Sequence, residues 1–206
     1  MNFSNDMPQA LLFDIGNVLV RFDFTHAAQK FAAQSDATSQ EVLALLAPFK
    51  DALESGRIAD DDFIAQSVKR IGFRGTRAEF VEIWGDIFTA NEPMIARVKQ
   101  LTGQVPLYLL SNTSGLHKTW LFEKFDVFGL FAGGIYSHEA RCMKPHEPIF
   151  QEAIKTFGLE PERTLYIDDL PDNIQTGRKL GFQCHQYHPD RHEEFEPVLT
   201  AFSQRV

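Results

Sequence analysis

Three short polar clusters stand at the ends of apolar runs, and their side chains are of the types that bind cations or phosphate. In chain order, the clusters are Asp14-Ile15-Gly16-Asn17, Ser111-Asn112-Thr113 and Asp168-Asp169. Each apolar run has the length and composition of a strand that is buried on both faces of a parallel sheet. Because ligands bind at the carboxyl ends of the strands in such sheets, we expect the three clusters to face one site.

Asp14, Asp168 and Asp169 would bring three carboxylates to one edge of the sheet. Packed carboxylates cannot all stay ionised without a cation, and Mg²⁺ takes oxygen ligands, usually one or two carboxylates plus waters. Each acid also has a purely structural interpretation, since Asp14 can cap its turn and either later acid can cap a helix at Pro171. Two adjacent acids exceed the need for one cap, so the pattern favours a Mg²⁺ site.

Two further features would bind the anion that such a cation attracts. Ser111 offers a hydroxyl, and the backbone amides around Asn112 and Thr113 are placed to hold an anion at the start of the next helix. Lys144 precedes Pro145 and another predicted helix, where its ammonium can neutralise a phosphate or a carboxylate cluster. Each feature alone is common as turn chemistry or as an exposed lysine, but together with the acids they predict a phosphate site.

The composition limits the compartment and the partners. The 206 residues carry a net charge of −8, which repels the phosphates of nucleic acids. The sequence contains no run of about 18 apolar residues that could cross a membrane. Residues 1–9 are polar and lack the basic and apolar regions of a signal peptide. Cys142 and Cys184 are too few for a disulfide framework. We therefore expect a cytoplasmic monomer or weak homodimer that binds neither nucleic acid nor membrane.

Between residues 25 and 89, the apolar spacing predicts four helices and no convincing strand. Asp60 is the predicted N-cap of the third helix, and Thr76 with Glu79 has the form of a capping box that opens the fourth. Four helices in about 65 residues are typical of a small bundle, and a β-type run flanks this segment on each side. We therefore interpret the segment as an insertion into the main domain.

From residue 91 onward, predicted strands and helices alternate. The helices are expected at residues 93–101, 115–124, 148–157 and 171–180, and the strands at residues 105–110, 131–136, 164–167 and 182–187. The charged final dozen residues are expected to form a surface helix. This alternation is typical of an α/β fold in which right-handed crossovers connect the strands of a parallel sheet.

Taken together, the ordered motifs Asp14, Ser111-Asn112, Lys144-Pro145 and Asp168-Asp169 resemble the four-motif signature of haloacid dehalogenase-like hydrolases. The resemblance covers nearly the whole chain. The stretches FDIGNVLVRFDF, LLSNTSGLH, MKPHEPIF and YIDDLPDNI are similar to the small-cap bacterial phosphatases of this family, a group that includes α-glucose-1-phosphate phosphatase. The resemblance implies a Rossmann-like core, residues 1–20 and 90–206, with a small α-helical cap, residues 21–89, inserted after the first strand.

The resemblance also implies Mg²⁺-dependent phosphoryl transfer through an aspartyl-phosphate on Asp14. The implied metal ligands are Asp14, Gly16 through its backbone carbonyl, Asp169, and Asp168 directly or through water. The implied catalytic residues are Asp14, Lys144 and Ser111, and the implied substrate-binding residues are Ser111, Asn112 and Lys144.

The chain departs from most phosphatases of this family at Gly16. Most of them carry a second Asp there, two residues after the nucleophile, which acts as general acid and then as base, a role worth about 10²–10⁴ in rate. Three explanations remain open. Another acid replaces it, with Asp23 or the cap residue Glu54 as candidates; the leaving group departs as a stable anion; or the protein binds phosphate compounds without turning them over.

The main hypothesis is therefore a Mg²⁺-dependent phosphatase of small phosphorylated metabolites, with sugar phosphates as the first candidates. A 2-haloacid dehalogenase is an alternative, because its halide leaving group needs no acid. The dehalogenases of this family need no metal, however, and lack the Asp168-Asp169 pair. A catalytically weak protein that binds phosphorylated metabolites is the other alternative.

Overall fold

The computed structural model describes residues 10–204, and its central element is a five-stranded parallel sheet. The strand order is β5-β4-β1-β6-β7, with β1 in the middle. The strands are β1 (Ala10–Phe13), β4 (Leu107–Ser111), β5 (Gly133–Tyr136), β6 (Thr164–Asp168) and β7 (Gln183–Gln186). The predicted α/β fold with a parallel sheet is confirmed, and every strand expected after residue 91 is present with bounds shifted by two residues at most.

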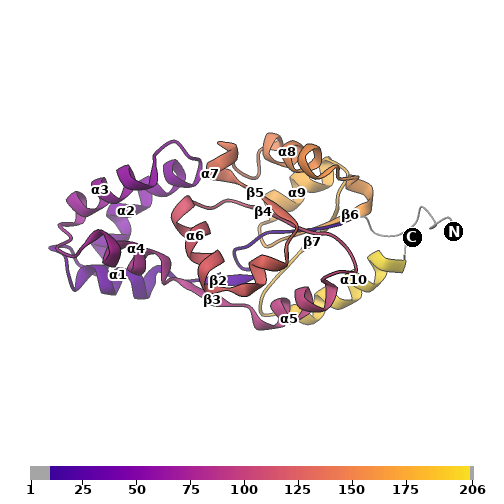
Figure 1. Cartoon of the computed structure of the whole chain (residues 1–206), viewed down its shortest axis with the longest axis horizontal. Helices are drawn as coiled ribbons and strands as arrows, with labels where there is room; N and C mark the ends of the chain where they lie inside the picture. Colours follow the sequence, from indigo (N-terminus) through magenta and orange to yellow (C-terminus); the bar gives the residue numbers. More distant parts are fainter. Residues whose placement is uncertain (1–9, 205–206) are drawn as a thin grey trace.

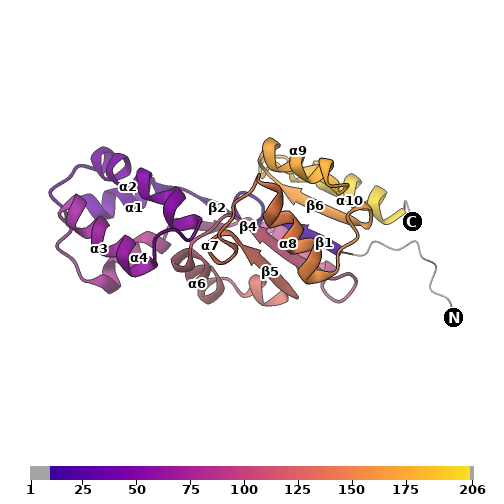
Figure 2. The same ribbon diagram turned by 90° about the horizontal axis from the view of Figure 1, so that it is seen from above.

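Helices cover both faces of this sheet (Figures 1 and 2). They are α5 (Glu92–Leu101), α6 (Gly115–Lys124), α7 (Ser137–Ala140), α8 (Glu147–Phe157), α9 (Pro171–Lys179) and α10 (Phe195–Gln204), with short 3-10 turns at Asp126–Leu130, Pro161–Arg163 and His192–Glu194. Leu11 and Phe13 pack with α5 and α10, whereas Ala10 and Leu12 pack with α8 and α9. Because successive strand residues point to opposite faces, β1 must be apolar at every position.

The final helix is more deeply packed than the sequence suggests. Phe195, Leu199 and Phe202 of α10 are buried in the core cluster that also contains Leu11 and Phe13 of β1. The helix expected over the final dozen residues is present, and because its apolar residues recur at helical spacing, one face is buried while the other stays at the surface.

Four helices gather at the end of the molecule opposite α10 (Figures 1 and 2). They are α1 (Phe24–Ala32), α2 (Ser39–Glu54), α3 (Asp60–Ile71) and α4 (Arg77–Gly85). They enclose a separate apolar cluster that includes Phe31, Phe63 and Phe80. The capping box of Thr76 and Glu79 is present, with each side chain bonded to the backbone of the other residue. This cluster supports the predicted helical cap, while its limits at residues 21 and 89 stay a prediction.

A short antiparallel ribbon connects these helices to the sheet, which corrects the expectation that residues 25–89 contain no strand. The ribbon pairs β2 (Val20–Phe22) with β3 (Phe88–Ala90). Its strands are only three residues long, too short for alternation to be recognised, and they form because the entry and the exit of the cap lie side by side.

The prediction that Asp60 is the N-cap of α3 is wrong. The N-cap is Ala59, which has an extended backbone and no capping side chain. The Asp60 carboxylate instead accepts a hydrogen bond from the backbone amide of Leu116 in α6. The acid thus joins the cap to the core, a use that local sequence does not reveal. Residues 1–9, on which the signal-peptide expectation rests, lie outside the described residues. Across residues 10–204, every helix is too short or too polar to span a membrane.

Candidate active site

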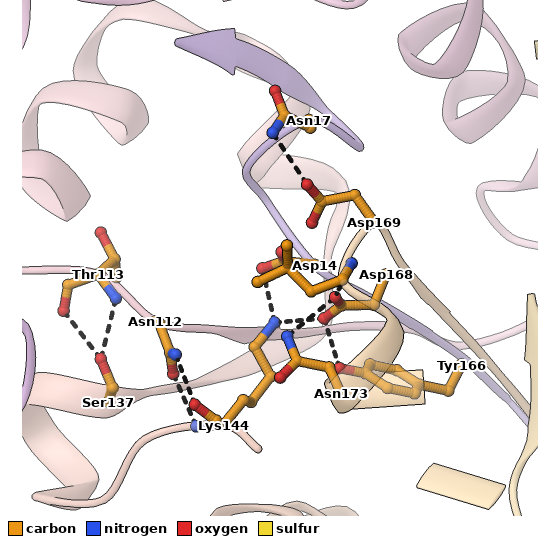
Figure 3. A network of polar contacts seen from close by, with 11 residues as sticks. Asp14, Asn17, Asn112, Thr113, Ser137, Lys144, Tyr166, Asp168, Asp169 and Asn173 are labelled. Atoms are coloured by element: carbon orange, nitrogen blue, oxygen red, sulfur yellow. Dashed lines mark hydrogen bonds and ion pairs between the residues drawn. The ribbon is translucent and has the colours of Figure 1, made fainter. Parts of the chain in front are cut away.

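The polar clusters that follow β1 and β6 meet at the carboxyl edge of the sheet, as the sequence predicts (Figure 3). Phe13 of β1 is in register with Ile167 of β6, so the next residues, Asp14 and Asp168, lie side by side at the edge of the sheet. Carboxylate oxygens of Asp14, Asp168 and Asp169 all lie within 4.8 Å of one another. Parallel pairing therefore assembles three acids that are far apart in the sequence.

Lys144 reaches into this cluster from the loop before α8. Its Nζ lies 2.8 Å from Asp14 Oδ1 and 2.6 Å from Asp168 Oδ2, and its side chain is only 1% exposed. Asn112 holds the Lys144 backbone at both ends: its Oδ1 accepts from the Lys144 amide at 2.8 Å, and its Nδ2 donates to the Lys144 carbonyl at 2.9 Å. The Asn112 side chain therefore positions the lysine, while Asn112 also lines the cavity where substrate binding was predicted.

Asp168 accepts hydrogen bonds at both carboxylate oxygens. Oδ2 accepts from Lys144 Nζ and from the Tyr166 hydroxyl at 2.5 Å, and Oδ1 accepts from the Leu170 amide and from Asn173 Nδ2, each at 2.9 Å. Four donors fix this carboxylate, which makes it an anchor for Lys144. Its contact with a metal, direct or through water, stays a prediction.

Asp169 is held by one side chain only in the described part of the chain. Its Oδ2 accepts from Asn17 Nδ2 at 2.9 Å, and Asn17 adopts the left-handed conformation, with φ 54°, that Asn tolerates better than most residues. This turn carries Gly16 and Asn17 back over the sheet edge, since the Asn17 amide bonds the Val20 carbonyl at 2.7 Å. Gly16 and Asp169 consequently line the same cavity as Asp14.

The acids carry more negative charge than the ammonium of Lys144 offsets. Burial raises the pKa of Asp14 to about 7, and the charges of Asp168 and Asp169 add to this rise while Lys144 opposes it. Burial also raises the pKa of Asp169. A cluster of hard oxygen donors whose ionisation is unfavourable fits a divalent cation, because the cation supplies the missing positive charge.

The cluster forms the floor of a cavity of about 380 Å³ between the sheet edge and the cap. Ser111, the last residue of β4, lines it together with Asn112 and Thr113. The Thr113 amide does not serve an anion there, because it donates to Ser137 Oγ at 2.9 Å. The sequence suggested Thr113 from its place before α6, but a tertiary contact uses its amide. The predicted site residues thus line one cavity, except Asp168, which is fully buried beneath it.

Glu54 is the cap residue that enters this cavity, at the end of α2. Its side chain is 13% exposed, and burial raises its pKa to about 7, an effect that Lys50 opposes and that Asp51 and Asp14 reinforce. The backbone carbonyl of Glu54 accepts a hydrogen bond from Ser137 Oγ of the core. The Glu54 backbone is therefore held against the core, and its half-buried carboxyl group has a pKa near neutral pH.

Asp23, the other acid considered in place of the missing one, has a different use. It is the N-cap of α1, and its Oδ1 accepts from the Thr25 amide at 2.8 Å. Hydrogen bonding with the Thr25 side chain, and then with its amide, lowers the pKa of the exposed Asp23 carboxyl. A carboxyl group that stays ionised on the surface is a poor proton donor, so the structure favours Glu54.

The space beside Gly16 is occupied by an aromatic ring. A Cβ atom added at Gly16 would lie 3.1 Å from Cε1 of Phe22, which belongs to β2 and is 40% exposed. The β2–β3 ribbon holds Phe22 in register with Phe88. The Phe22 ring therefore lies beside the position at which most phosphatases of the haloacid dehalogenase-like family carry a carboxylate. The sequence did not reveal this, because the two residues meet only through the turn between them.

His117 also lines the cavity but is a packing residue. Its Nε2 lies 3.1 Å from the Trp84 carbonyl, and its ring stacks on that of Trp84 with centroids 5.2 Å apart. Burial lowers the pKa of His117 to about 4. The ring is thus neutral at physiological pH and joins α6 to α4 of the cap.

Comparison with known proteins gives a consistent assignment. A family model described as haloacid dehalogenase-like hydrolase matches residues 8–181. The chain is 28% identical over 206 residues to D-ribitol-5-phosphate phosphatase of Bacteroides thetaiotaomicron, covering 95% of this chain and 98% of that protein.

Solved structures show the same fold. A HAD-like family hydrolase from Porphyromonas gingivalis is 27% identical with a TM-score of 0.75, covering 97% of this chain and all of that one. A HAD family enzyme of Bacteroides thetaiotaomicron, in complex with magnesium and inorganic phosphate, is 23% identical with a TM-score of 0.76, covering 86% and 92%. The family model spans most of the chain, and the chain therefore belongs to the haloacid dehalogenase-like hydrolases.

Proposed function

We propose that this protein is a Mg²⁺-dependent phosphatase of small phosphorylated metabolites that forms an aspartyl-phosphate on Asp14. The observation that carries the proposal is the contact of Asp14 with the buried ammonium of Lys144, on the floor of a cavity that also contains Asp169 and Ser111. A nucleophilic carboxylate, a fixed cation and a hydroxyl donor converge on one small volume. Phosphoryl transfer depends on such positioning and charge stabilisation.

In the first step, an Asp14 oxygen attacks phosphorus and the ester bond between phosphorus and the alcohol oxygen breaks. The electron pair of that bond goes to the alcohol oxygen, which takes a proton from Glu54. Lys144 offsets the charge of the transferring group, while Ser111 and Asn112 at the end of β4 hold it. In the second step, water attacks phosphorus, its proton goes to Glu54, and the electron pair of the acyl-phosphate bond returns to Asp14.

The residues present fit a magnesium ion, which Asp14, Asp169 and the Gly16 backbone carbonyl would hold. The ion would draw negative charge from the phosphoryl oxygens when bound. The raised pKa values of Asp14 and Asp169 support this assignment.

Glu54 is proposed as the general acid and base that Gly16 cannot provide. Proton transfer is most efficient when the pKa of the donor lies near the working pH, and the pKa of Glu54 is about 7. The acid would thus come from the cap, whereas in most phosphatases of the family it follows the nucleophile.

Sugar or polyol phosphates are the finer proposal for the substrate. The support is the relative named D-ribitol-5-phosphate phosphatase, which is similar to this chain over nearly its full length. The polar side chains around the cavity, among them Lys50 and Asp51, are of the types that bind hydroxyl groups.

Phosphate release tests the proposal directly. The purified protein would be given p-nitrophenyl phosphate and a panel of sugar phosphates with Mg²⁺ or with EDTA, and a 2-chloroacid with EDTA in parallel. We expect phosphate release that requires Mg²⁺ and no chloride release. Mg²⁺ binding without turnover of any ester would favour the binding-protein alternative, and chloride release in EDTA would favour a dehalogenase.

A further inference from the structure

An apolar cavity of about 270 Å³ lies in the cap beside the cavity that contains Asp14. Ala28 and Phe31 of α1, Val42 and Leu46 of α2, and Trp84 of α4 line it, and all five are buried. We call it the cap cavity. Its volume is close to the lower limit of ligand pockets, about 300–1,000 Å³, and its walls offer few hydrogen-bond partners.

The cap cavity adjoins the cavity of the acids. Phe22, Phe24 and Lys50 line both cavities. Phe22 is the residue whose ring covers Gly16, two residues after Asp14. A group attached to the alcohol oxygen of a bound phosphate ester would therefore meet this ring first and the cap cavity beyond it.

Exposed apolar side chains gather around the same two cavities. Four large apolar residues are exposed among the described residues: Phe22 (40%), Leu43 (42%), Phe122 (41%) and Leu170 (51%). Phe22 and Leu43 line the cap cavity, and Leu170 lines the cavity of the acids. Single exposed apolar residues are common, but three of them on the walls of two adjoining cavities indicate a binding surface.

We propose that the cap cavity is a subsite for an apolar group on the alcohol part of the substrate. The protein then also hydrolyses phosphate monoesters of apolar alcohols, alkyl phosphates above all, beside the polyol phosphates that the polar side chains of the acid cavity can bind. A polyol chain placed there would lose its hydrogen bonds with water and gain few in return, which is unfavourable. This inference rests on the proposed phosphatase function and adds a second substrate class to the one that the ribitol-phosphate relative suggests.

A series of n-alkyl phosphates measures the subsite. kcat/KM for ethyl, butyl, hexyl and octyl phosphate would be compared with that for glycerol phosphate and ribitol phosphate, all with Mg²⁺. Once the chain reaches the cap cavity, we expect kcat/KM to rise about 4-fold for each added methylene, which corresponds to ~0.8 kcal/mol per buried CH₂. The rise should stop when the cavity is full.

Two alanines of α2 offer a matched pair of variants. Ala47 and Ala44 are both exposed, and only Ala47 lines the cap cavity. Ala47→Phe should remove the dependence on chain length while leaving ethyl phosphate turnover unchanged, whereas Ala44→Phe should keep the whole series as in the wild type. If Ala47→Phe does not fold, Leu43→Asn tests the same wall, because Leu43 is an exposed lining residue.

The outcomes separate this inference from the proposed function. Turnover of ethyl and ribitol phosphate without any dependence on chain length would overturn the subsite and leave the phosphatase standing. Equal losses for Ala47→Phe and Ala44→Phe would also overturn it, as would a dimer that only Ala47→Phe dissociates, since the cavity would then serve an interface. Failure to turn over any ester would overturn both proposals.

Discussion

Glu54→Gln removes the proposed general acid while keeping the size and polarity of the side chain. The substitution should lower kcat/KM for alkyl or polyol phosphates by about 10²–10⁴, the usual contribution of general acid catalysis. This corresponds to about 2.7–5.4 kcal/mol of transition-state stabilisation at ~1.36 kcal/mol per tenfold change. For p-nitrophenyl phosphate the loss should stay within a few-fold, because its leaving group departs as a stable anion.

The pH dependence gives the same test a second form. Between about pH 6 and about pH 8, the protonated fraction of a group whose pKa is about 7 falls about tenfold. The ratio of kcat/KM for an alkyl phosphate to that for p-nitrophenyl phosphate should therefore fall about tenfold in the wild type and stay flat in Glu54→Gln. Taking the ratio cancels the titration of groups that act on both esters, such as Asp14.

Asp51→Asn, assayed on the alkyl and aryl esters only, is the matched control, since Asp51 lies on the same helix and lines the same cavity, and neither ester has sugar hydroxyl groups that Asp51 could bind. Steady-state phosphate release over a pH series is sufficient for all three proteins. Equal losses on the alkyl and aryl esters in Glu54→Gln, or the same pattern in Asp51→Asn, would refute the assignment of Glu54 as proton donor.

Three further predictions follow from buried or close contacts. Lys144→Met leaves two buried carboxylates, Asp14 and Asp168, without their cation. The free energy of unfolding in EDTA at neutral pH, measured by urea titration, should therefore fall by about 3–5 kcal/mol. A loss below about 1 kcal/mol would contradict the ion pairs of Lys144 with these two acids. Gly56 has a φ of 68°, and a Cβ there would lie 2.2 Å from the His138 carbonyl oxygen. Gly56→Ala should therefore displace the end of α2 and lower the alkyl-to-aryl ratio as Glu54→Gln does, and an unchanged ratio would show that this contact does not place the acid. The pKa of Glu54 is about 7 in the folded protein and 4.5 in the unfolded chain. The protonated group therefore stabilises the folded state at low pH, and the free energy of unfolding should fall as the pH rises from 4.5 to about 7. Across this pH range, the free energy of unfolding of the wild type should fall by about 3 kcal/mol more than that of Glu54→Gln, from ~1.4 kcal/mol per pH unit of pKa shift. If the free energies of unfolding of the two proteins, measured by urea titration, change in parallel with pH, the raised pKa is contradicted.

The convergence of the acids was predictable because it depends on a regular geometry. Buried apolar runs identify the strands, parallel pairing aligns their carboxyl ends, and Asp14 and Asp168 are adjacent to two of those ends. Lys144 could be added because its charge complements the acids, and the bonds of Asn112 to its backbone show how it is held.

Contacts between distant residues were not predictable from local patterns. Phe22 covers Gly16 only because the turn at residues 17–19 and the β2–β3 ribbon fold it back. Glu54 is one of many acids on predicted cap helices. It differs from the others because burial raises its pKa and because the bond from Ser137 to its carbonyl holds its backbone against the core. Asp60 has the sequence context of an N-cap but bonds the backbone of another helix. In each case tertiary packing decides between uses that the local sequence permits equally.

Trapping the phosphoenzyme tests the central claim most directly. Protein mixed with p-nitrophenyl phosphate and Mg²⁺ would be quenched in acid within milliseconds, digested and analysed by mass spectrometry, with Asp14→Asn treated in parallel. We predict a phosphoryl group on the peptide that contains Asp14, its accumulation in Glu54→Gln because the second step also needs a base, and neither phosphopeptide nor phosphate release in Asp14→Asn. Sustained phosphate release by Asp14→Asn, or a phosphoryl group on another residue, would contradict the account.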